Sequence, residues 1–290
     1  MIQAAIDNGG PDDAESLAAT AAGQGRYTLA EYGYRHACKS RADDPDKGTD
    51  HPATLTARHN LARILSFSGR LEEAESATRA VLAARTQLLG ADHPDTLASR
   101  SNLAIVLHDL DRPEEAETEA RAVLHARTRV LGPHHADTLT SRHNLTVFML
   151  SQGQLEAEAD NHAVLEARSR VLGADHADTL VSRYVHSIFL HRLGRLEEAE
   201  AEARNALEAR VRILGSEHPA TSASRANLAA LLCDLGRLDE AAVHARSALE
   251  TRLRVLGAEH PAVASSRSQL ARIQQATSSR ITAEAGEDPL

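Results

Sequence analysis

Apolar residues along this chain recur at steps of three and four, the spacing that places them on one side of an α-helix. Between residues 50 and 68, Leu55, Ala62 and Leu65 share such a stripe, and a second stripe follows Gly69. Gly69 interrupts the pattern, and Gly90 ends it at a point where a glycine commonly terminates a helix. The segment therefore predicts two helices joined by a tight turn, a helix hairpin.

This hairpin pattern is repeated along the chain. The segment that starts at Asp50 returns with variations at equal intervals, and each copy carries a marker histidine: His51, His93, His135, His176, His218 and His260. The interval is 42 residues except for one of 41, in the copy that reads QLEAE where the first and fourth full repeats read RLEEAE. Residues 17–41 align as a further, diverged copy. Because isolated hairpins cannot bury their apolar stripes, stacked units are predicted: an all-α, α–α solenoid of about 13 helices.

The repeats also predict the domain limits. We expect a flexible N-terminus over residues 1–11 and a disordered acidic tail over 277–290. The solenoid is expected over 12–276, comprising a diverged first unit (12–49), five full repeats (50–258) and a half-repeat cap (259–276).

Three strings recur in register: N-L-A-x-x-L, G-R-L-E-E-A-E and V-L-x-x-R-x-x-x-L-G-x-D-H-P. They resemble the tetratricopeptide repeat in its 42-residue, kinesin light chain-like form, here of bacterial type. The resemblance implies alternating A and B helices in a right-handed superhelix. It also implies that the A helices line a concave groove that binds peptides or partner proteins.

Charge and composition narrow the partner classes. The chain has 290 residues with 32 basic and 41 acidic side chains, a formal charge of -9, which disfavours nucleic acid or an anionic membrane as partner. Two distant cysteines form no CxxC pair, and no apolar run reaches the roughly 18 residues of a membrane helix. The start lacks the order of a secretion signal. A cytoplasmic protein with a protein or peptide ligand is expected.

The asparagine of the N-L-A string points to a binding surface. Asn60, Asn102, Asn144 and Asn227 lie on a helical stripe whose other residue types change from copy to copy. In related grooves such an asparagine holds the ligand backbone, because one carboxamide can both donate to and accept from an extended peptide. The alternative, an amide that bonds only within the scaffold, stays open here.

The same stripe supplies the other candidate binding residues. They are His59, Arg63, Ile105, His108, His143, Val147, Leu150, Tyr184, Val185, Ile188 and His191. In the fourth repeat Val185 and His186 replace the usual Asn and Leu, which indicates either a decayed repeat or a specialised pocket.

Two rows of arginines recur as well. In the first row the arginine stands three residues before the Leu of N-L-A: Arg58, Arg100, Arg142, Arg183, Arg225 and Arg267. The guanidinium groups of this row are expected to bond to carboxylates or carbonyls of the scaffold, with anion binding as the alternative. The other lies near the ends of the B helices, where a cation complements the helix dipole: Arg41, Arg85, Arg127, Arg168, Arg210 and Arg252.

The 16 histidines invite a metal site, yet the spacing argues against one. Equivalent histidines two repeats apart, such as His59 and His143, are separated by about 20 Å if neighbouring helices lie 8–10 Å apart. Zinc requires ligand atoms about 2 Å from one centre. No metal, cofactor or catalytic residue is therefore predicted.

Three functions remain, in order of preference. The first is a non-catalytic adaptor that binds a peptide or helix of another protein in the groove. The second is a regulatory or sensor module that controls a separate effector, an NTPase or a transcription factor, including by self-association. The third is an unusual enzyme built from His108, Asp109, His143 and Tyr184, although GxSxG, HExxH and phosphate-loop motifs are absent. Partner identity and oligomeric state stay open.

Overall fold

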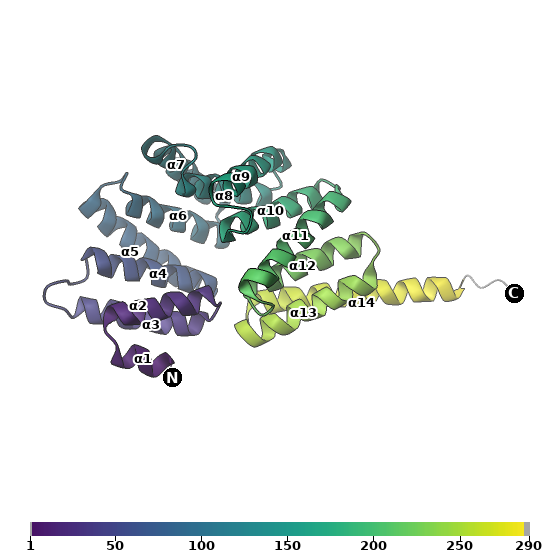
Figure 1. Ribbon diagram of the computed structural model, residues 1–290, viewed down its shortest axis with the longest axis horizontal. Coiled ribbons are helices and arrows are strands. Elements are labelled where there is room, and N and C mark those ends of the chain that lie inside the picture. Colours follow the sequence, from purple (N-terminus) through teal and green to yellow (C-terminus); the bar gives the residue numbers. More distant parts are fainter. Residues whose placement is uncertain (1, 287–290) are drawn as a thin grey trace. The chain divides into compact units, whose positions relative to one another are not determined.

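The computed structural model describes residues 2–286 of the chain, and within them it contains α-helices, one 3-10 helix and no strand (Figure 1). The predicted all-α solenoid is confirmed. Its elements are α1 (Ile2–Asn8), α2 (Pro11–Gly23), α3 (Tyr27–Ala42), α4 (Pro52–Phe67), α5 (Leu71–Leu89), α6 (Pro94–Asp109), α7 (Pro113–Leu131), α8 (Ala136–Ser151), η1 (Leu155–Ala157), α9 (Glu158–Val171), α10 (Ala177–Arg192), α11 (Leu196–Leu214), α12 (Pro219–Asp234), α13 (Leu238–Leu256) and α14 (Pro261–Gly286).

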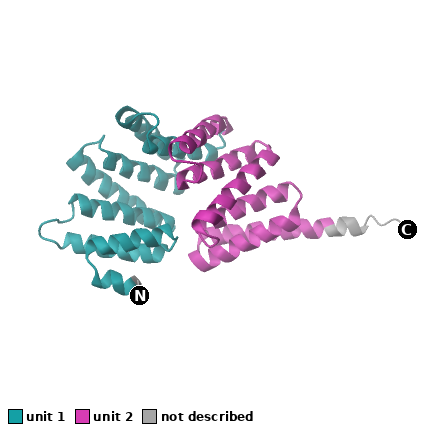
Figure 2. Ribbon diagram, in the orientation of Figure 1, with its two compact units in different colours: residues 1–154 teal, residues 155–290 magenta. Residues whose placement is uncertain are grey.

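The helices divide between two compact units, residues 1–154 and 155–290 (Figure 2). In each unit consecutive helices pack against one another as hairpins, with the even-numbered helices from α2 onward as A helices and the odd-numbered ones from α3 onward as B helices. A helices of successive repeats also touch, α4 with α6 and α6 with α8 in the first unit, α10 with α12 and α12 with α14 in the second. Each unit therefore has an inner row of A helices.

The marker histidines begin the A helices. His93 is the residue before α6, and its Nδ1 accepts a hydrogen bond from the backbone N–H of Asp95 at 3.2 Å. Pro94 then occupies the first helical position, where a missing N–H costs nothing. His51, His135, His176 and His218 cap α4, α8, α10 and α12 in the same way. These marker histidines are thus helix caps.

Glycines end most B helices, as the sequence predicts. Gly90 follows α5 with φ 91°, and Gly132 follows α7 with φ 88°, a region that glycine enters without steric cost. The chain then turns into the next A helix.

The shortened copy changes the fold locally. Where α5, α7, α11 and α13 each have 19 residues, the 3-10 helix η1 precedes an α9 of only 14. The missing residue falls at the start of this B helix, so the usual first turn cannot form in register. The division between the two units, after Gln154, lies at the same place.

Ion pairs join consecutive B helices inside each unit. Arg112 Nη1 on the turn before α7 lies 2.8 Å from Glu75 Oε1 on α5, and Arg237 Nη1 lies 2.6 Å from Glu200 Oε1. Gln154 stands at the position equivalent to Arg112 and cannot form such a pair. The arginine of this pair is thus missing at the turn before η1.

Small residues let the helices approach closely. Ala74 and Ala116 in the first unit, and Ala203 and Ala241 in the second, are at most 1% exposed. Such contacts bury little area each but bring neighbouring backbones together, which explains how a chain with only 2% aromatic residues forms a core.

Helices at both ends extend beyond the predicted solenoid limits. Helix α1 lies within residues 1–11, and its Ile6 is fully buried. Helix α14 continues from Pro261 to Gly286, since no proline or glycine interrupts the chain between those two residues. Residues 287–290 lie outside the described part of the chain.

Candidate functional site: the A-helix face

The side chains that A helices carry on the predicted binding stripe are called the A-helix face here. In the first unit the predicted residues are Asn60, His59 and Arg63 on α4, Asn102, Ile105 and His108 on α6, and His143, Asn144, Val147 and Leu150 on α8. In the second unit they are Tyr184, Val185, Ile188 and His191 on α10, and Asn227 on α12. Within each unit they lie on A helices that touch one another.

Four of the predicted binding residues are buried. Asn102, His143, Leu150 and Val185 are between 5% and 7% exposed. Ile105, Val147, His108 and the other half-buried residues reach solvent, and Arg63 is exposed. The buried four contribute to packing rather than to an open surface.

Three of the asparagine amides are engaged within the scaffold. Asn102 Nδ2 donates to Thr78 Oγ1 at 2.9 Å and Asn227 Nδ2 to Ser187 Oγ at 2.8 Å, whereas Asn60 Nδ2 lies 3.3 Å from Glu15 Oε1. A buried amide that lost such a partner would be left with an unmet hydrogen bond. For these three, the Nδ2 donor is used within the scaffold, as the alternative of a scaffold amide expects.

Adjacent A helices are linked by polar pairs near their C-terminal ends. In the first unit His108 Nε2 lies 2.9 Å from Ser151 Oγ and Ser66 Oγ lies 3.4 Å from Asp109 Oδ2. The His108 ring also stacks on Phe148, with ring centroids 4.7 Å apart. These contacts hold the polar edge of the A-helix face in one arrangement.

The same pairing occurs in the second unit. His191 Nε2 lies 2.6 Å from Asp234 Oδ2, again with 43 residues between the partners. The bond between an A helix and the next one is therefore a property of the repeat, although its chemistry changes from copy to copy.

Ser151, His108 and Asp109 have the order of a hydroxyl, an imidazole and a carboxylate. However, Ser151 Oγ donates its hydrogen to the backbone oxygen of Phe148 at 2.7 Å, so its oxygen accepts from the imidazole. His108 Nδ1 is a long 3.4 Å from Asp109 Oδ1. A base cannot activate a hydroxyl whose hydrogen is directed elsewhere, so this arrangement is a structural bridge.

The arginines at the ends of the B helices are buried, which the sequence did not indicate. Arg85 is 3% exposed, and its Nη1 donates to Asp95 O at 3.0 Å and Ser99 Oγ at 2.9 Å on the next A helix. The same two bonds recur at Arg127, Arg168, Arg210 and Arg252. The signal available in the sequence was a serine 14 residues after each arginine.

Only some of these buried charges meet a carboxylate. Arg41 contacts Asp12 at 2.5 Å and Glu15 at 2.6 Å. At the place equivalent to Asp12 the next hairpin has Thr56, whose hydroxyl lies 3.2 Å from Arg85 Nη2, and at the place equivalent to Glu15 it has His59. Within the described residues Arg85 has no ion pair, and burial lowers the pKa of its guanidinium. Positive charge therefore lies beneath the A-helix face of the first unit.

Arg210 takes a comparable position in the second unit. Its guanidinium lies 4.9 Å from the centre of the Tyr184 ring, over the face of an aromatic side chain of α10. Burial lowers the pKa of Arg210 and raises that of Tyr184.

The pKa of His59 on the A-helix face is strongly lowered. Burial, reinforced by the charges of Arg85 and Arg63, lowers the pKa of His59 to about 3. The ring is therefore neutral at neutral pH and offers one donor and one acceptor.

The repeated helix hairpin, packed against the next one through its A helix, is the feature that identifies the family of this chain. Profiles of the tetratricopeptide repeat match residues 54–95, 96–137 and 138–178, and also 186–252 and 224–284. The chain belongs to the tetratricopeptide repeat family. No curated protein matches it.

Solved tetratricopeptide-type structures share the fold. A Podosopora anserina protein of nearly identical TPR-like repeats, named for kinesin light chain, is 25% identical over 70% of this chain and 97% of its own, with a TM-score of 0.53. BtubC (BKLC) from P. vanneervenii is 21% identical, covering 81% and 92%, with a TM-score of 0.56. The Rap conjugation gene regulator of the plasmid pLS20, in complex with the Phr* peptide, is 15% identical, covering 91% and 73%, with a TM-score of 0.63.

The described residues provide neither a metal site nor a membrane span. Across the part of the chain that the structure describes, no group of three or more His, Cys, Asp or Glu side chains is placed to hold a metal ion. Among the described residues of this tetratricopeptide repeat protein, no helix has both the length and the apolar character to cross a bilayer.

Proposed function

We propose that the protein is a non-catalytic adaptor of the cytoplasm that binds a peptide segment or a helix of a partner protein on its A-helix face. The observation that carries this proposal is the contrast between constant and variable positions. The bonds of Arg85 recur at Arg127, Arg168, Arg210 and Arg252, whereas the solvent-reaching positions differ, with Arg63, Ile105 and Val147 in the first unit. A repeated scaffold with changing surface residues is suited to one specific ligand.

Charge indicates what kind of segment fits the first unit. Arg63 is exposed, and the guanidinium of Arg85 lies beside the hydroxyl of Thr56 without an ion pair among the described residues. Ile105 and Val147 add aliphatic surface on neighbouring A helices. A segment that carries carboxylates next to aliphatic side chains would complement both features.

Similar structures support the general mode of binding. The Rap protein complexed with Competence and Sporulation Factor and the Rap regulator in complex with the Phr* peptide hold ligands on the same fold at 12% and 15% identity. We do not assign these ligands to the present protein. We propose only that it binds a peptide on the same fold.

A peptide array tests the proposal directly. Acidic, aliphatic-rich peptides are screened against the full chain, and the best binder is measured with matched variants. Val147→Asp on the A-helix face should weaken it at least about tenfold. Val130→Asp, the same change on the outward side of α7 where Val130 is 47% exposed, should not. Equal affinity of both variants, each checked for folding by its thermal melt, would remove the A-helix face as the binding site.

Arg63→Glu supplies a second test that leaves the core alone, because Arg63 is exposed. Charge reversal should weaken acidic peptides and strengthen basic ones. An unchanged preference would mean that the charge of this face does not select the partner.

A second candidate function, regulation by self-association, is favoured by a different surface. One outward aliphatic position recurs on the B helices, Leu88 and Val130 in the first unit, at 54% and 47% exposed. Its equivalents in the second unit are Val171 and Ile213, at 51% and 45%. Light scattering distinguishes the candidates, since self-association through this surface would be lost in Val130→Asp while peptide binding is kept.

A further inference from the structure

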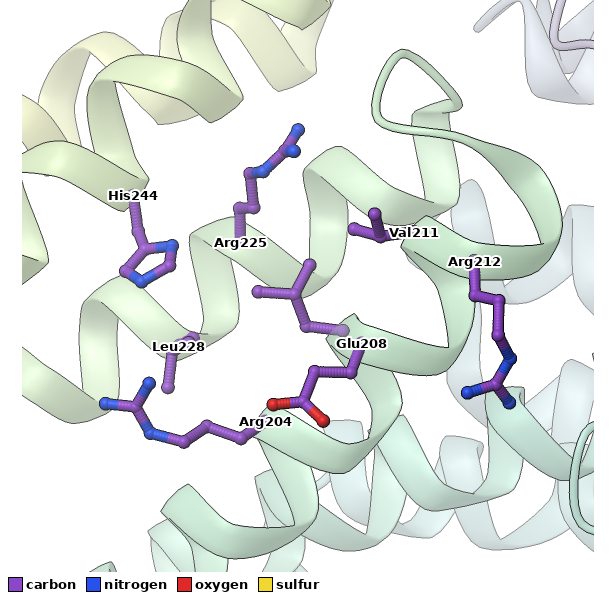
Figure 3. Close-up of a pocket in the computed structure, with 8 residues that line it drawn as sticks. Arg204, Glu208, Val211, Arg212, Arg225, Leu228 and His244 are labelled. Atoms are coloured by element: carbon purple, nitrogen blue, oxygen red, sulfur yellow. The ribbon is translucent and has the colours of Figure 1, made fainter.

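The second unit contains a cavity of about 440 Å³ outside the A-helix face. It lies among α11, α12 and α13, and Figure 3 shows the side chains around it. Leu207 and Val211 provide an apolar lining, while Arg204, Arg225 and His244 provide nitrogen donors. A volume of this size is within the usual range for a small-molecule site.

Comparison of the repeats shows how this cavity arises. In the second repeat Arg100 on α6 pairs with Glu119 on α7, and in the fourth Arg183 Nη1 lies 2.9 Å from Glu202 Oε2. The partners are 19 residues apart in both. In the fifth repeat the residue 19 positions after Arg225 is His244.

Arg225 is consequently left without its carboxylate. Its Nη1 donates to the backbone oxygen of Ser216 at 2.7 Å, and no carboxylate of the described residues lies within ion-pair distance. The replacement puts an imidazole where a carboxylate would neutralise the guanidinium. A histidine in place of glutamate thus opens a donor-rich pocket over Leu228.

The other charged groups at the cavity are mostly engaged. Arg204 contacts Glu200 at 2.8 Å and Glu240 at 3.3 Å, and Arg212 contacts Asp175 at 2.7 Å. The carboxylate of Glu208 extends away from the Arg225 guanidinium in Figure 3. Arg225 therefore remains the cation most in need of an anion.

We propose that this cavity binds a small carboxylate with a short aliphatic body. Its carboxylate occupies the place that Glu119 and Glu202 hold in other repeats, between Arg225 and His244. Its aliphatic part lies against Leu207 and Val211. The site is separate from the A-helix face, and it does not depend on the function proposed above.

His244 makes the binding pH-dependent. Burial, followed by the charges of Arg204 and Arg225, lowers the pKa of His244, and Glu240 opposes this effect. Without a bound ligand the imidazole is therefore neutral at neutral pH. Glu208 and Arg212 also line the cavity. A bound carboxylate favours the protonated ring, so affinity should rise as the pH falls toward the ordinary histidine pKa of about 6.5.

Calorimetric titration of the full chain with hexanoate tests the proposal, with acetate and inorganic phosphate as comparison ligands. Hexanoate should bind most tightly. Acetate lacks the aliphatic body, and phosphate has no apolar part to pack against the apolar lining of the cavity. His244→Glu restores the internal pair of the other repeats and should weaken hexanoate at least about tenfold without lowering the melting temperature. His125→Glu, the same change at an exposed position of α7, is the control.

Each outcome decides the question. If phosphate bound more tightly than hexanoate, the ligand would be an anion other than an aliphatic carboxylate, and the proposal would be overturned. Absence of binding, or equal binding by His244→Glu and His125→Glu, would also overturn it. Glu208→Gln, which removes the nearby negative charge, should strengthen hexanoate binding, and weaker binding in that variant would place the ligand elsewhere.

Discussion

Arg41 Nη1 lies 2.6 Å from Glu15 Oε2, an ion pair in which the arginine side chain is only 4% exposed. Glu15→Gln leaves this buried guanidinium with one carboxylate fewer. We expect a loss of about 1–3 kcal/mol in the free energy of unfolding of the first unit. Urea unfolding measures it, with Glu72→Gln, an exposed glutamate of α5, as control. Equal losses in both variants would show that Glu15 does not stabilise Arg41.

Asn102 should behave as a scaffold residue. Asn102→Ala removes the bond to Thr78 Oγ1 and should cost about 1 kcal/mol of stability while leaving the affinity for an A-helix-face peptide unchanged. Thr78→Val removes the same bond from the other side, so the double variant should be less destabilised than the sum of the two. A peptide affinity that falls in Asn102→Ala alone would return this amide to the binding surface.

Acid should loosen the pairing of consecutive B helices. Burial raises the pKa of Glu75, but hydrogen bonds from Arg79 and Arg112 outweigh it, so the pKa lies below its ordinary value of 4.5. A lowered folded-state pKa means that the carboxylate stabilises the fold above pH 4.5 and that this is lost as the pH falls through the folded-state value. Thermal melts from pH 6 downward should show a smaller loss in Glu75→Gln than in the unaltered chain. Parallel curves would contradict this.

His59 predicts a second pH effect in a different window. Its folded-state pKa of about 3 lies below the ordinary 6.5, so the neutral ring stabilises the fold above pH 6.5 and protonation of the unfolded chain removes that stability below it. Between pH 6.5 and 5.5 the loss should be about 1 kcal/mol. His59→Asn should lack this loss, whereas His125→Asn, at an exposed position, should retain it.

The missing B-helix pair can be restored. Gln154 is 37 residues after Glu117, as Arg112 is after Glu75, so Gln154→Arg can reach Glu117. We expect a gain of up to about 1 kcal/mol, limited because Glu117 already contacts Arg121 at 2.6 Å. Arg112→Gln should produce the opposite change. A gain in both variants, one of which makes a pair while the other breaks one, would show that this pairing does not stabilise the fold.

The sequence predicted the hairpins well because their signals are local. Apolar spacing, the proline after a marker histidine and the glycine after a B helix each act within one or two turns. Because the hairpin sequence is repeated in register and one hairpin cannot bury its own apolar stripe, the units had to stack. The shortened copy was visible too, although its effect on η1 and α9 depends on how a helix start accommodates a lost residue.

The candidate site was only partly predictable, because side-chain partners lie far apart in sequence. Asn102 meets Thr78 on a preceding B helix, and the periodicity of α6 alone cannot show whether an amide faces solvent or a neighbouring hydroxyl. The buried arginines were misjudged for a similar reason. A cation near a helix end satisfies the dipole rule equally well whether it points outward or toward Ser99.

The bond from Arg127 Nη1 to Ser141 Oγ has the same form as that from Arg85 to Ser99. If residues 96–137 were deleted, Arg85 would meet Ser141 across a junction identical in kind to the one it lost. Whole hairpins can thus be gained or lost by unequal crossing-over without any new interface having to evolve. The number of hairpins in such a protein can therefore change during evolution while the contacts between neighbouring hairpins stay the same.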